Sequence, residues 1–331
     1  MKRILCLIDT LGMGGAERQM IGLALFLKEK GYHVDLVTYY DHDFYAELVD
    51  RYGLGSVTLH VKDSKWSKLQ AVKRHIKQAG GYDWVIAYKN GPAIIGCMLK
   101  MMGAKFRLIV SERNTNQSIS RGDKMKFWFY RWADYVVPNA YAQEKFIKQN
   151  FAALSNKTVT ITNFTDTDHF KPIAITPNDK LVVMTAARVA KQKNILNYLE
   201  AIKRLKLDGY TDDVHFDWYG DVQTGEEEYD VFCLPSIYEG FPNVVCEAMS
   251  CGKPIACSRV CDNPHIVQEN KNGIFFNPTD VDSIYNGLKL IIEMPKEERL
   301  AWGHKSREIA ETLFSKEAFV QKYIKLIESK V

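Results

Sequence analysis

The segment RILCLIDTLGMGGAERQMIGLALFLKEKGYHVDLVTYY (residues 3–40) decides the fold class. An apolar run of β type leads into a glycine-rich loop, a helical pattern from about Ala16 to Lys30, and a second apolar run. Because a helix connects the two expected strands, they should lie parallel in one sheet. The segment therefore predicts a β-α-β unit with its glycine loop at the carboxyl end of the first strand.

The same alternation of strand and helix continues along the chain. We expect further strands near residues 56–61, 83–88, 106–111, 135–140, 157–162, 181–187, 215–220, 231–236 and 254–258. We expect further helices near residues 44–51, 65–78, 92–102, 124–133, 141–151, 195–206, 243–250, 281–293, 297–313 and 316–329. The pattern predicts an α/β protein with two Rossmann-like, doubly wound domains that face each other across a cleft. Their expected bounds are residues 1–163 and 164–315, and a C-terminal helix over residues 316–331 is expected to pack back on the first domain.

Composition narrows the class of protein. The 331 residues include seven cysteines, an odd number without a CxxC pair, which indicates reduced thiols. No apolar run is long enough for a signal peptide or a membrane span, so we expect a cytoplasmic protein. Residues 1–163 hold 24 Lys and Arg against 14 Asp and Glu, and the remainder holds 20 against 26. The basic first half favours an anionic partner or surface.

The loop LGMGGAERQ (residues 11–19) follows the first strand and opens a helix, so its backbone N–H groups can approach an anion. It departs from the dinucleotide pattern GxGxxG, because Glu17 stands in place of the third glycine. Three interpretations remain open here: contact with phosphate or sugar, a tight turn alone, or binding of NAD(P).

Two charged patterns lie at expected strand ends in the second half. Arg188 and Lys193 follow the strand near residues 181–187, where paired cations could stabilise a departing diphosphate; a solvated basic loop is the alternative. Glu239 and Glu247 flank the turn of Gly240, Phe241, Pro242 and Asn243, which begins a helix. Such carboxylates can accept hydrogen bonds from a ribose diol and from sugar hydroxyls, and the exposed N–H groups of the turn suit sugar oxygens or phosphate. The alternative, two glutamates on a solvated helix face, fits poorly with so apolar a run.

Several motifs together resemble one family. These are GGAE (residues 14–17), R-x4-K (188–193), E-x7-E (239–247), ITNFTDTDHFKP (161–172) and NPHIVQENKNGIFFNP (263–278). They are similar to those of the retaining glycosyltransferases of family 4, which have the two-domain GT-B fold. SERN (residues 111–114) resembles a subgroup that builds capsular, O-antigen or lipid-linked oligosaccharides.

The resemblance implies a role for each matching residue. Arg188 and Lys193 would hold the donor diphosphate, and Glu247 would bind the nucleotide ribose. Glu239, with the backbone of residues 240–243, would orient the transferred sugar. Gly14 and Gly15 would approach the phosphate or the acceptor from the first domain. The acceptor itself would lie mainly on this first domain, and the nucleotide sugar would bind to the second. No enzyme nucleophile and no metal would be required, and a UDP-sugar is favoured over a GDP-sugar as co-substrate.

The sequence departs from the family near residues 221–229. Only VQTGEEE separates two strands where the family has a helix, a strand and another helix, a difference of roughly 30–40 residues by ordinary element lengths. A nucleotide-sugar-binding protein impaired in turnover is therefore the main alternative to an active transferase. An NAD-dependent oxidoreductase is a further, weaker alternative.

The remaining patterns concern partners. A basic helix near residues 65–78 and the aromatic, basic segment at residues 121–135 suit an anionic membrane surface, although ordinary amphipathic helices explain them equally well. No nucleic-acid-binding signature is present. The triplet Asp166-Thr167-Asp168 is expected to form an Asx turn rather than a metal site. We therefore expect a retaining hexosyltransferase of polysaccharide synthesis at the inner face of the cell membrane, acting on a glycan or polyprenyl-linked acceptor.

Overall fold

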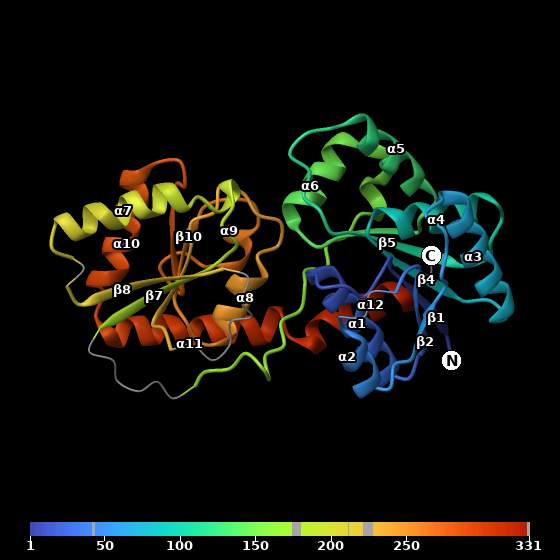
Figure 1. Cartoon of the computed structure of the whole chain (residues 1–331), viewed down its shortest axis with the longest axis horizontal. Helices are drawn as coiled ribbons and strands as arrows, with labels where there is room; N and C mark the ends of the chain where they lie inside the picture. Colours follow the sequence, from blue (N-terminus) through green and yellow to red (C-terminus); the bar gives the residue numbers. More distant parts are fainter. Residues whose placement is uncertain (42–43, 174–179, 211, 221–227, 330–331) are drawn as a thin grey trace. The chain divides into compact units, whose positions relative to one another are not determined.

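The chain forms two compact α/β units, each built on one parallel sheet (Figure 1). The computed structural model describes residues 1–41, 44–173, 180–210, 212–220 and 228–329. The first unit comprises residues 1–162 and the chain from Phe319 onward, and the second unit comprises Asn163–Ala318. The fold class predicted from the sequence is confirmed.

The sheet of the first unit has the strand order β3-β2-β1-β4-β5-β6. Its strands are β1 (Arg3–Leu7), β2 (His33–Thr38), β3 (Ser56–Thr58), β4 (Trp84–Tyr88), β5 (Arg107–Glu112) and β6 (Tyr135–Pro138). The helices are α1 (Gly15–Glu29), α2 (Ala46–Arg51), α3 (Lys65–Gln78), α4 (Asn90–Met101), α5 (Arg121–Phe129) and α6 (Tyr141–Asn150). Strands β1 and β4 are apolar almost throughout and buried, as strands covered on both faces require.

Helix α12 (Lys316–Glu328) completes the first unit. Its Tyr323 hydroxyl lies 2.9 Å from the hydroxyl of Tyr88 at the end of β4. The Nζ atom of Lys2 donates to an Oε atom of Glu328 at 2.6 Å. The C-terminal helix therefore packs on the first sheet by both a buried and an exposed contact.

The sheet of the second unit has the strand order β11-β10-β9-β7-β8. Its strands are β7 (Leu181–Ala186), β8 (Val214–Tyr219), β9 (Val231–Leu234), β10 (Ile255–Ser258) and β11 (Gly273–Phe276). The helices are α7 (Ile195–Leu207), α8 (Asn243–Ser250), α9 (Asn263–Ile266), α10 (Val281–Glu293) and α11 (Lys296–Leu313). Because all the strands are parallel, the loops after β7, β9 and β10 leave the sheet at one edge.

Two predicted elements differ from the structure. The strand expected at residues 157–162 is wrong: Thr158 forms only an isolated bridge to Val136. The helix expected at residues 124–133 begins earlier, because Ser120 and Asp123 form a capping box, and it gives way to a 3-10 turn at Tyr130–Trp132.

Strand β11 was not predicted, since the four residues GIFF at 273–276 carry little pattern. Its Gly273 allows close packing, because a Cβ atom there would lie 2.4 Å from the carbonyl oxygen of Ile255 on β10.

Candidate functional site

The loop after β7 and the loop after β9 meet through a buried ion pair. The Nζ atom of Lys193 lies 2.5 Å from an Oε atom of Glu239, and both side chains are largely buried. The amide N–H of Ile237 donates to the carbonyl of Gln192, and the Gln192 side chain donates to the carbonyl of Tyr238. Two of the predicted site residues are therefore in direct contact, and backbone bonds hold their loops in register.

Asn194 fixes the loop that carries Lys193, although sequence reasoning did not single it out. Its backbone is left-handed, with φ at 61°, a conformation that asparagine tolerates better than most residues. Its buried side-chain amide donates to the carbonyls of Pro235 and Pro278, at 3.1 and 2.7 Å. Asn194 thus connects the segments that follow β7, β9 and β11. The sequence feature that could have identified it is an asparagine directly before a helix.

Arg188 has a different environment from Lys193. It lies just beyond β7 and is exposed. No carboxylate in the described ranges pairs with it. Its guanidinium group therefore remains available to an anionic ligand, whereas the ammonium group of Lys193 already has a carboxylate partner.

The turn at residues 240–243 is held in place by one core contact and one side-chain hydrogen bond. Phe241 is buried and packs edge-on against Phe314, with ring centroids 5.7 Å apart. Asn243 is the first residue of α8, and its side-chain oxygen accepts a hydrogen bond from Asn163 at 2.7 Å. Only the backbone of Phe241 is thus open to the role predicted for it, because its ring belongs to the core.

Glu247 lies one turn into α8, on the helix face that also carries Val244 and Cys251. This face borders a small cavity together with Phe170 and Tyr229. No hydrogen bond or ion pair within the described residues joins Glu247 to Glu239. The two glutamates of the motif therefore have separate surroundings, one in a polar loop and one beside aromatic rings.

The glycine loop of the first unit is shaped around Glu17. Gly14 caps α1 in an extended conformation, and Gly15 is the first helical residue. A Cβ atom on Gly14 would lie 2.3 Å from an Oε atom of Glu17. Glu17 is buried and forms an ion pair with Lys89, which follows β4. The space left by Gly14 is thus filled by a carboxylate at the positive end of the helix.

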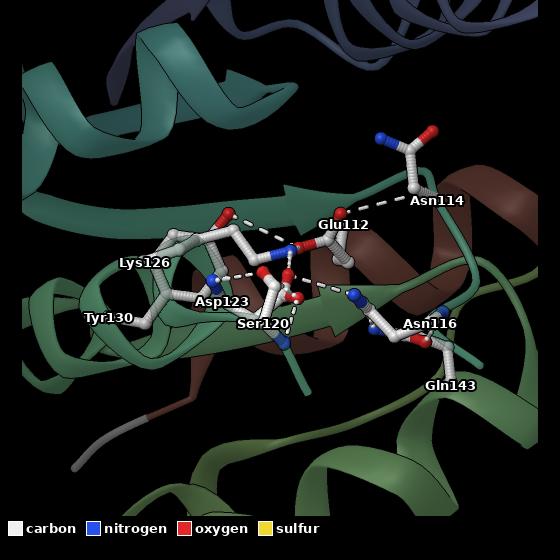
Figure 2. A network of polar contacts seen from close by, with 8 residues as sticks. All are labelled: Glu112, Asn114, Asn116, Ser120, Asp123, Lys126, Tyr130 and Gln143. Carbon is white, nitrogen blue, oxygen red and sulfur yellow. Dashed lines mark hydrogen bonds and ion pairs between the residues drawn. The ribbon is translucent and has the colours of Figure 1, made fainter. Parts of the chain in front are cut away.

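A polar network holds the segment after β5 (Figure 2). Glu112 and Lys126 are both buried and form an ion pair of 2.7 Å. The Asp123 carboxylate accepts hydrogen bonds from the backbone N–H and hydroxyl of Ser120 and from the side-chain amide of Asn116. Reciprocal hydrogen bonds of 2.8 Å link Asn116 and Gln143 of α6. The segment at residues 113–120 is therefore tied through Asn114, Asn116 and Ser120 to the end of β5, to α5 and to α6 (Figure 2).

This network corrects the surface assigned to residues 121–135. Lys126 belongs to the basic segment expected to suit a membrane surface, but only 5% of it is exposed, because it pairs with Glu112. Met125 and Trp128 of the same helix are 49% and 42% exposed, and Trp66 of α3 is 61% exposed. The exposed surface is thus aromatic and basic without Lys126. No helix in the described part of the chain has the length and apolar character to cross a bilayer.

Asp166 behaves as the sequence indicated. Its Oδ1 atom accepts hydrogen bonds from the backbone N–H groups of Asp168 and His169, as in an Asx turn. The same atom lies 3.0 Å from the Nζ atom of Lys316. The triplet thus closes a turn and joins it to the start of α12.

Models of two protein families match the chain. The model described as Glycosyltransferase Family 4 matches residues 13–169, and the model described as Glycosyl transferases group 1 matches residues 209–309. The first match contains the glycine loop and the network after β5. The second contains both glutamates of the E-x7-E motif.

Curated relatives match over most of their length. An N-acetylgalactosamine-N,N'-diacetylbacillosaminyl-diphospho-undecaprenol 4-alpha-N-acetylgalactosaminyltransferase of Campylobacter jejuni is 24% identical, over 89% of this chain and 92% of the relative. A second Campylobacter jejuni enzyme, an alpha-1,4-N-acetyl-D-galactosaminyltransferase, is 24% identical over 88% of this chain and 89% of the relative.

Solved structures share the architecture. HepE of Anabaena, solved in complex with UDP, superposes with a TM-score of 0.81 at 18% identity, and the match covers both chains completely. A glycosyltransferase of Rickettsia africae gives a TM-score of 0.82 at 14% identity, over 99% of this chain and 98% of the other. The chain therefore has the GT-B fold of these structures, with a domain that matches the Glycosyltransferase Family 4 model followed by one that matches the Glycosyl transferases group 1 model.

Proposed function

We propose that the protein transfers a sugar, with retention of anomeric configuration, from a nucleotide diphosphate sugar to a hydroxyl group of a glycan or lipid-linked acceptor. The observation that carries this proposal is the pairing of Lys193 with Glu239 at the carboxyl edge of the second sheet, on the same loop after β7 that carries the exposed Arg188. A cation pair and a carboxylate at such an edge suit a diphosphate and a sugar respectively.

Each residue has a separate task in this proposal. Arg188 and Lys193 stabilise the negative charge that develops on the departing diphosphate, without a metal ion. Glu239 accepts hydrogen bonds from hydroxyl groups of the transferred sugar, and Glu247 binds the ribose diol. The bond from the anomeric carbon to the diphosphate breaks, the acceptor oxygen bonds to that carbon on the same face, and the acceptor proton leaves with the diphosphate.

The names of relatives support the substrate classes. The Campylobacter relative is named for a diphospho-undecaprenol acceptor, and an Escherichia coli relative, 35% identical over 22% of this chain, is named for UDP-Gal and an alpha-D-GlcNAc-diphosphoundecaprenol. HepE was solved with UDP. These names favour a UDP-sugar as donor and a polyprenyl diphosphate sugar as acceptor for this chain, in cell-surface polysaccharide synthesis.

The test is a panel of UDP-sugars and GDP-sugars measured by calorimetry, followed by a transfer assay on diphospho-undecaprenol saccharides. Glu247→Gln should weaken binding of the nucleotide and of the nucleotide sugar alike, because the ribose is common to both. Glu239→Gln should spare the nucleotide and reduce transfer of the sugar. Lys206→Ala, an exposed cation on α7, serves as the matched surface control.

The outcomes separate the alternatives. Donor binding without acceptor glycosylation would favour a nucleotide-sugar-binding protein impaired in turnover. A rise in melting temperature with a nicotinamide cofactor alone would favour an oxidoreductase, since ligands stabilise the folded state they bind.

We also infer that a helix-strand-helix segment is missing near residues 221–229. Residues 221–227 lie outside the described ranges, but their neighbours end β8 and precede β9. The alignment with the first Campylobacter relative spans 343 positions and holds 89% of this chain, so about 48 of its positions have no residue here. The five-stranded second sheet supports the same inference.

Association with an anionic membrane is part of the proposal. Trp66, Met125 and Trp128 are exposed on α3 and α5, where Lys65 and Lys124 are exposed beside them. Vesicles that contain anionic phospholipid should retain the protein at low salt and release it at high salt. The reason is that salt screens electrostatic attraction beyond a distance of about 10 Å at 0.1 M. Trp128→Ala should weaken retention, whereas Leu196→Ala on α7 of the second unit, an apolar residue that is more exposed than Trp128, should not. Retention independent of lipid charge would contradict the membrane assignment.

A further inference from the structure

The longest open edge among the described strands belongs to β8. In the described part of the chain, β8 pairs only with β7. It has six residues, whereas the other outer strands, β3, β6 and β11, have three or four. Its sequence, VHFDWY, contains no lysine or proline, the residues that commonly prevent an edge from pairing. Such an edge offers its backbone hydrogen-bonding groups to a further strand.

The backbone of β8 shows which residues face the open side. The carbonyls of Asp213 and Tyr219 accept hydrogen bonds of 2.9 and 2.8 Å from backbone N–H groups of the β7 segment, so they point toward β7. Since the backbone groups of successive residues alternate in direction, those of three residues between them point away from β7. These residues are Val214, Phe216 and Trp218.

A second copy of β8 fits these outward groups in one register. About a twofold axis, two copies of one strand run antiparallel. An axis at Phe216 pairs the outward groups of both copies and places each His215 opposite an Asp217. The neighbouring registers, shifted by two residues, bring Asp217 opposite Asp217 or His215 opposite His215. Of these three registers, only the one at Phe216 sets imidazole opposite carboxylate.

The side chains of His215 and Asp217 lie on the same face of β8. Their Nε2 and Oδ1 atoms are 3.1 Å apart, and 65% of the His215 side chain is exposed. In the register at Phe216 these residues form non-hydrogen-bonded pairs, whose Cα atoms lie only about 4.5 Å apart. Opposite charges in such pairs stabilise a sheet, and like charges destabilise it. The edge is therefore complementary to itself.

Helix α7 adds an exposed apolar residue on the same side. Its Arg204 pairs with Asp282 of α10, which packs on β10 and β11, away from β8. Leu199 lies five positions before Arg204, nearly opposite around the helix, and is 52% exposed. The preceding residue, Tyr198, packs edge-on against the Phe216 ring. An axis at Phe216 would therefore bring the two copies of Leu199 together and remove them from water.

We propose that two copies of this chain associate through β8, antiparallel about a twofold axis at Phe216. The association joins their second sheets into one continuous sheet. A second copy suits this edge better than an unrelated strand, because the hydrogen-bonding groups and the charges select the same register. The inference is independent of the sugar-transfer proposal, since it uses none of the residues assigned to the donor or the acceptor.

Sedimentation equilibrium on the full chain, over a range of concentrations, should show monomer and dimer. His215→Asp places a carboxylate opposite each Asp217 and should raise the dimer dissociation constant at least about tenfold. Adding Asp217→Lys to this variant restores opposite charges and should restore association. His33→Asp is the matched control: it makes the same change beside Asp35 on β2, a strand with neighbours on both sides, and should leave association unchanged.

Cysteine cross-linking tests the register. In a mixture, the His215→Cys and Asp217→Cys chains should form a disulfide-linked heterodimer, because the two positions lie about 4.5 Å apart between Cα atoms. Either variant alone should not, since its two introduced thiols would stand on a diagonal, with Cα atoms about 7–8 Å apart. The unsubstituted chain, with its seven cysteines, shows any background linkage.

Several results would overturn the inference. These are a chain that stays monomeric at every concentration, a dimer that His215→Asp leaves unchanged, and linkage of either cysteine variant to itself in place of the mixed pair. Melting temperatures at the lowest concentration show whether a charge variant remains folded. If His215→Asp unfolds the chain, the cross-link decides: the mixed pair supports the register, and its absence contradicts it.

Discussion

The two sheets follow the same plan but differ at one end. In the first sheet the order is β3-β2-β1-β4-β5-β6, and the second has the same order, with β8, β7, β9, β10 and β11 in the places of β2, β1, β4, β5 and β6. Among the described residues, no strand of the second sheet takes the place of β3. Strand β8 is thus an outer strand, and all but Val214 of its residues are at least partly exposed.

The loop edges of the two sheets differ as well. At the first edge, Glu112 and Lys126 are almost fully buried, and the charges hold the chain in place. At the second edge, Arg188 is exposed, and Lys193 has a single carboxylate partner. Removing one partner of a buried ion pair leaves the other charge buried and uncompensated, which is costly, whereas the exposed Arg188 can bind a ligand without giving up a carboxylate partner. The following predictions test this contrast, from the largest effect to the smallest.

Loss of the buried cation should affect stability most. Lys126→Met leaves the Glu112 carboxylate buried without its ion-pair partner, and about 3–5 kcal/mol of unfolding free energy should be lost. Urea unfolding measures the change. Lys124→Met, two residues away and exposed, should change stability by less than about 0.5 kcal/mol. Equal losses in both variants would show that the buried pair with Glu112 contributes no more to stability than an exposed cation of the same helix.

Loss of the exposed cation should affect binding instead. Arg188→Ala should leave the melting temperature unchanged, because no described carboxylate pairs with Arg188. It should weaken binding of UDP by about 1.5–3 kcal/mol, the scale of a charge-assisted hydrogen bond, and leave uridine binding nearly unchanged. Calorimetry with both ligands provides the comparison. Similar losses for UDP and uridine would show that the guanidinium group does not contact the diphosphate.

The open side of β8 should appear in amide hydrogen exchange. The amides of β2 have strands on both sides, β1 and β3, whereas β8 pairs only with β7. In dilute solution, where the dimer proposed above dissociates, alternate amides of β8 should therefore exchange at least tenfold faster than those of β2, equivalent to about 1.4 kcal/mol of protection. Equal protection throughout both strands would mean that another segment or a second molecule covers β8.

Acid should weaken each unit through one paired aspartate. Burial acts to raise the pKa of Asp123, but hydrogen bonds from Ser120 and Asn116 lower it overall. In the second unit, burial likewise acts to raise the pKa of Asp166, but the hydrogen bond and the charge of Lys316 lower it overall. An aspartate whose pKa is lowered by folding stabilises the folded state when the pH is above its unfolded-state pKa of about 3.9. This stabilisation is lost as the pH falls through the pKa of the folded state.

Asp123→Asn and Asp166→Asn should therefore each lower the melting temperature slightly at pH 7, and the difference from the unchanged protein should shrink below about pH 4. Scanning calorimetry between pH 3 and 7 measures this. A difference that stays constant with pH would mean that the variants act through packing rather than through charge.

The sequence predicted most of the elements because their signals are local. The glycine loop sets the start of α1, and the apolar runs at β1, β4, β7 and β9 fit only strands covered on both faces. It failed where neighbours decide the outcome. Residues 157–162 have strand composition but only one bridging partner, and β11 exists because β10 offers it an edge.

For the site, the sequence by itself determined which charged residues follow which strands. The motifs place two cations, Arg188 and Lys193, after β7, and two glutamates, Glu239 and Glu247, after β9. Parallel strands bring the loops that follow them to one edge of the sheet. Only the tertiary structure decided their partners: it paired Lys193 with Glu239, buried Lys126 against Glu112 and left Asp9 with an unsatisfied oxygen. Spacing along a chain fixes local geometry, but the partner of a charge depends on side chains tens of residues away, which only packing brings together.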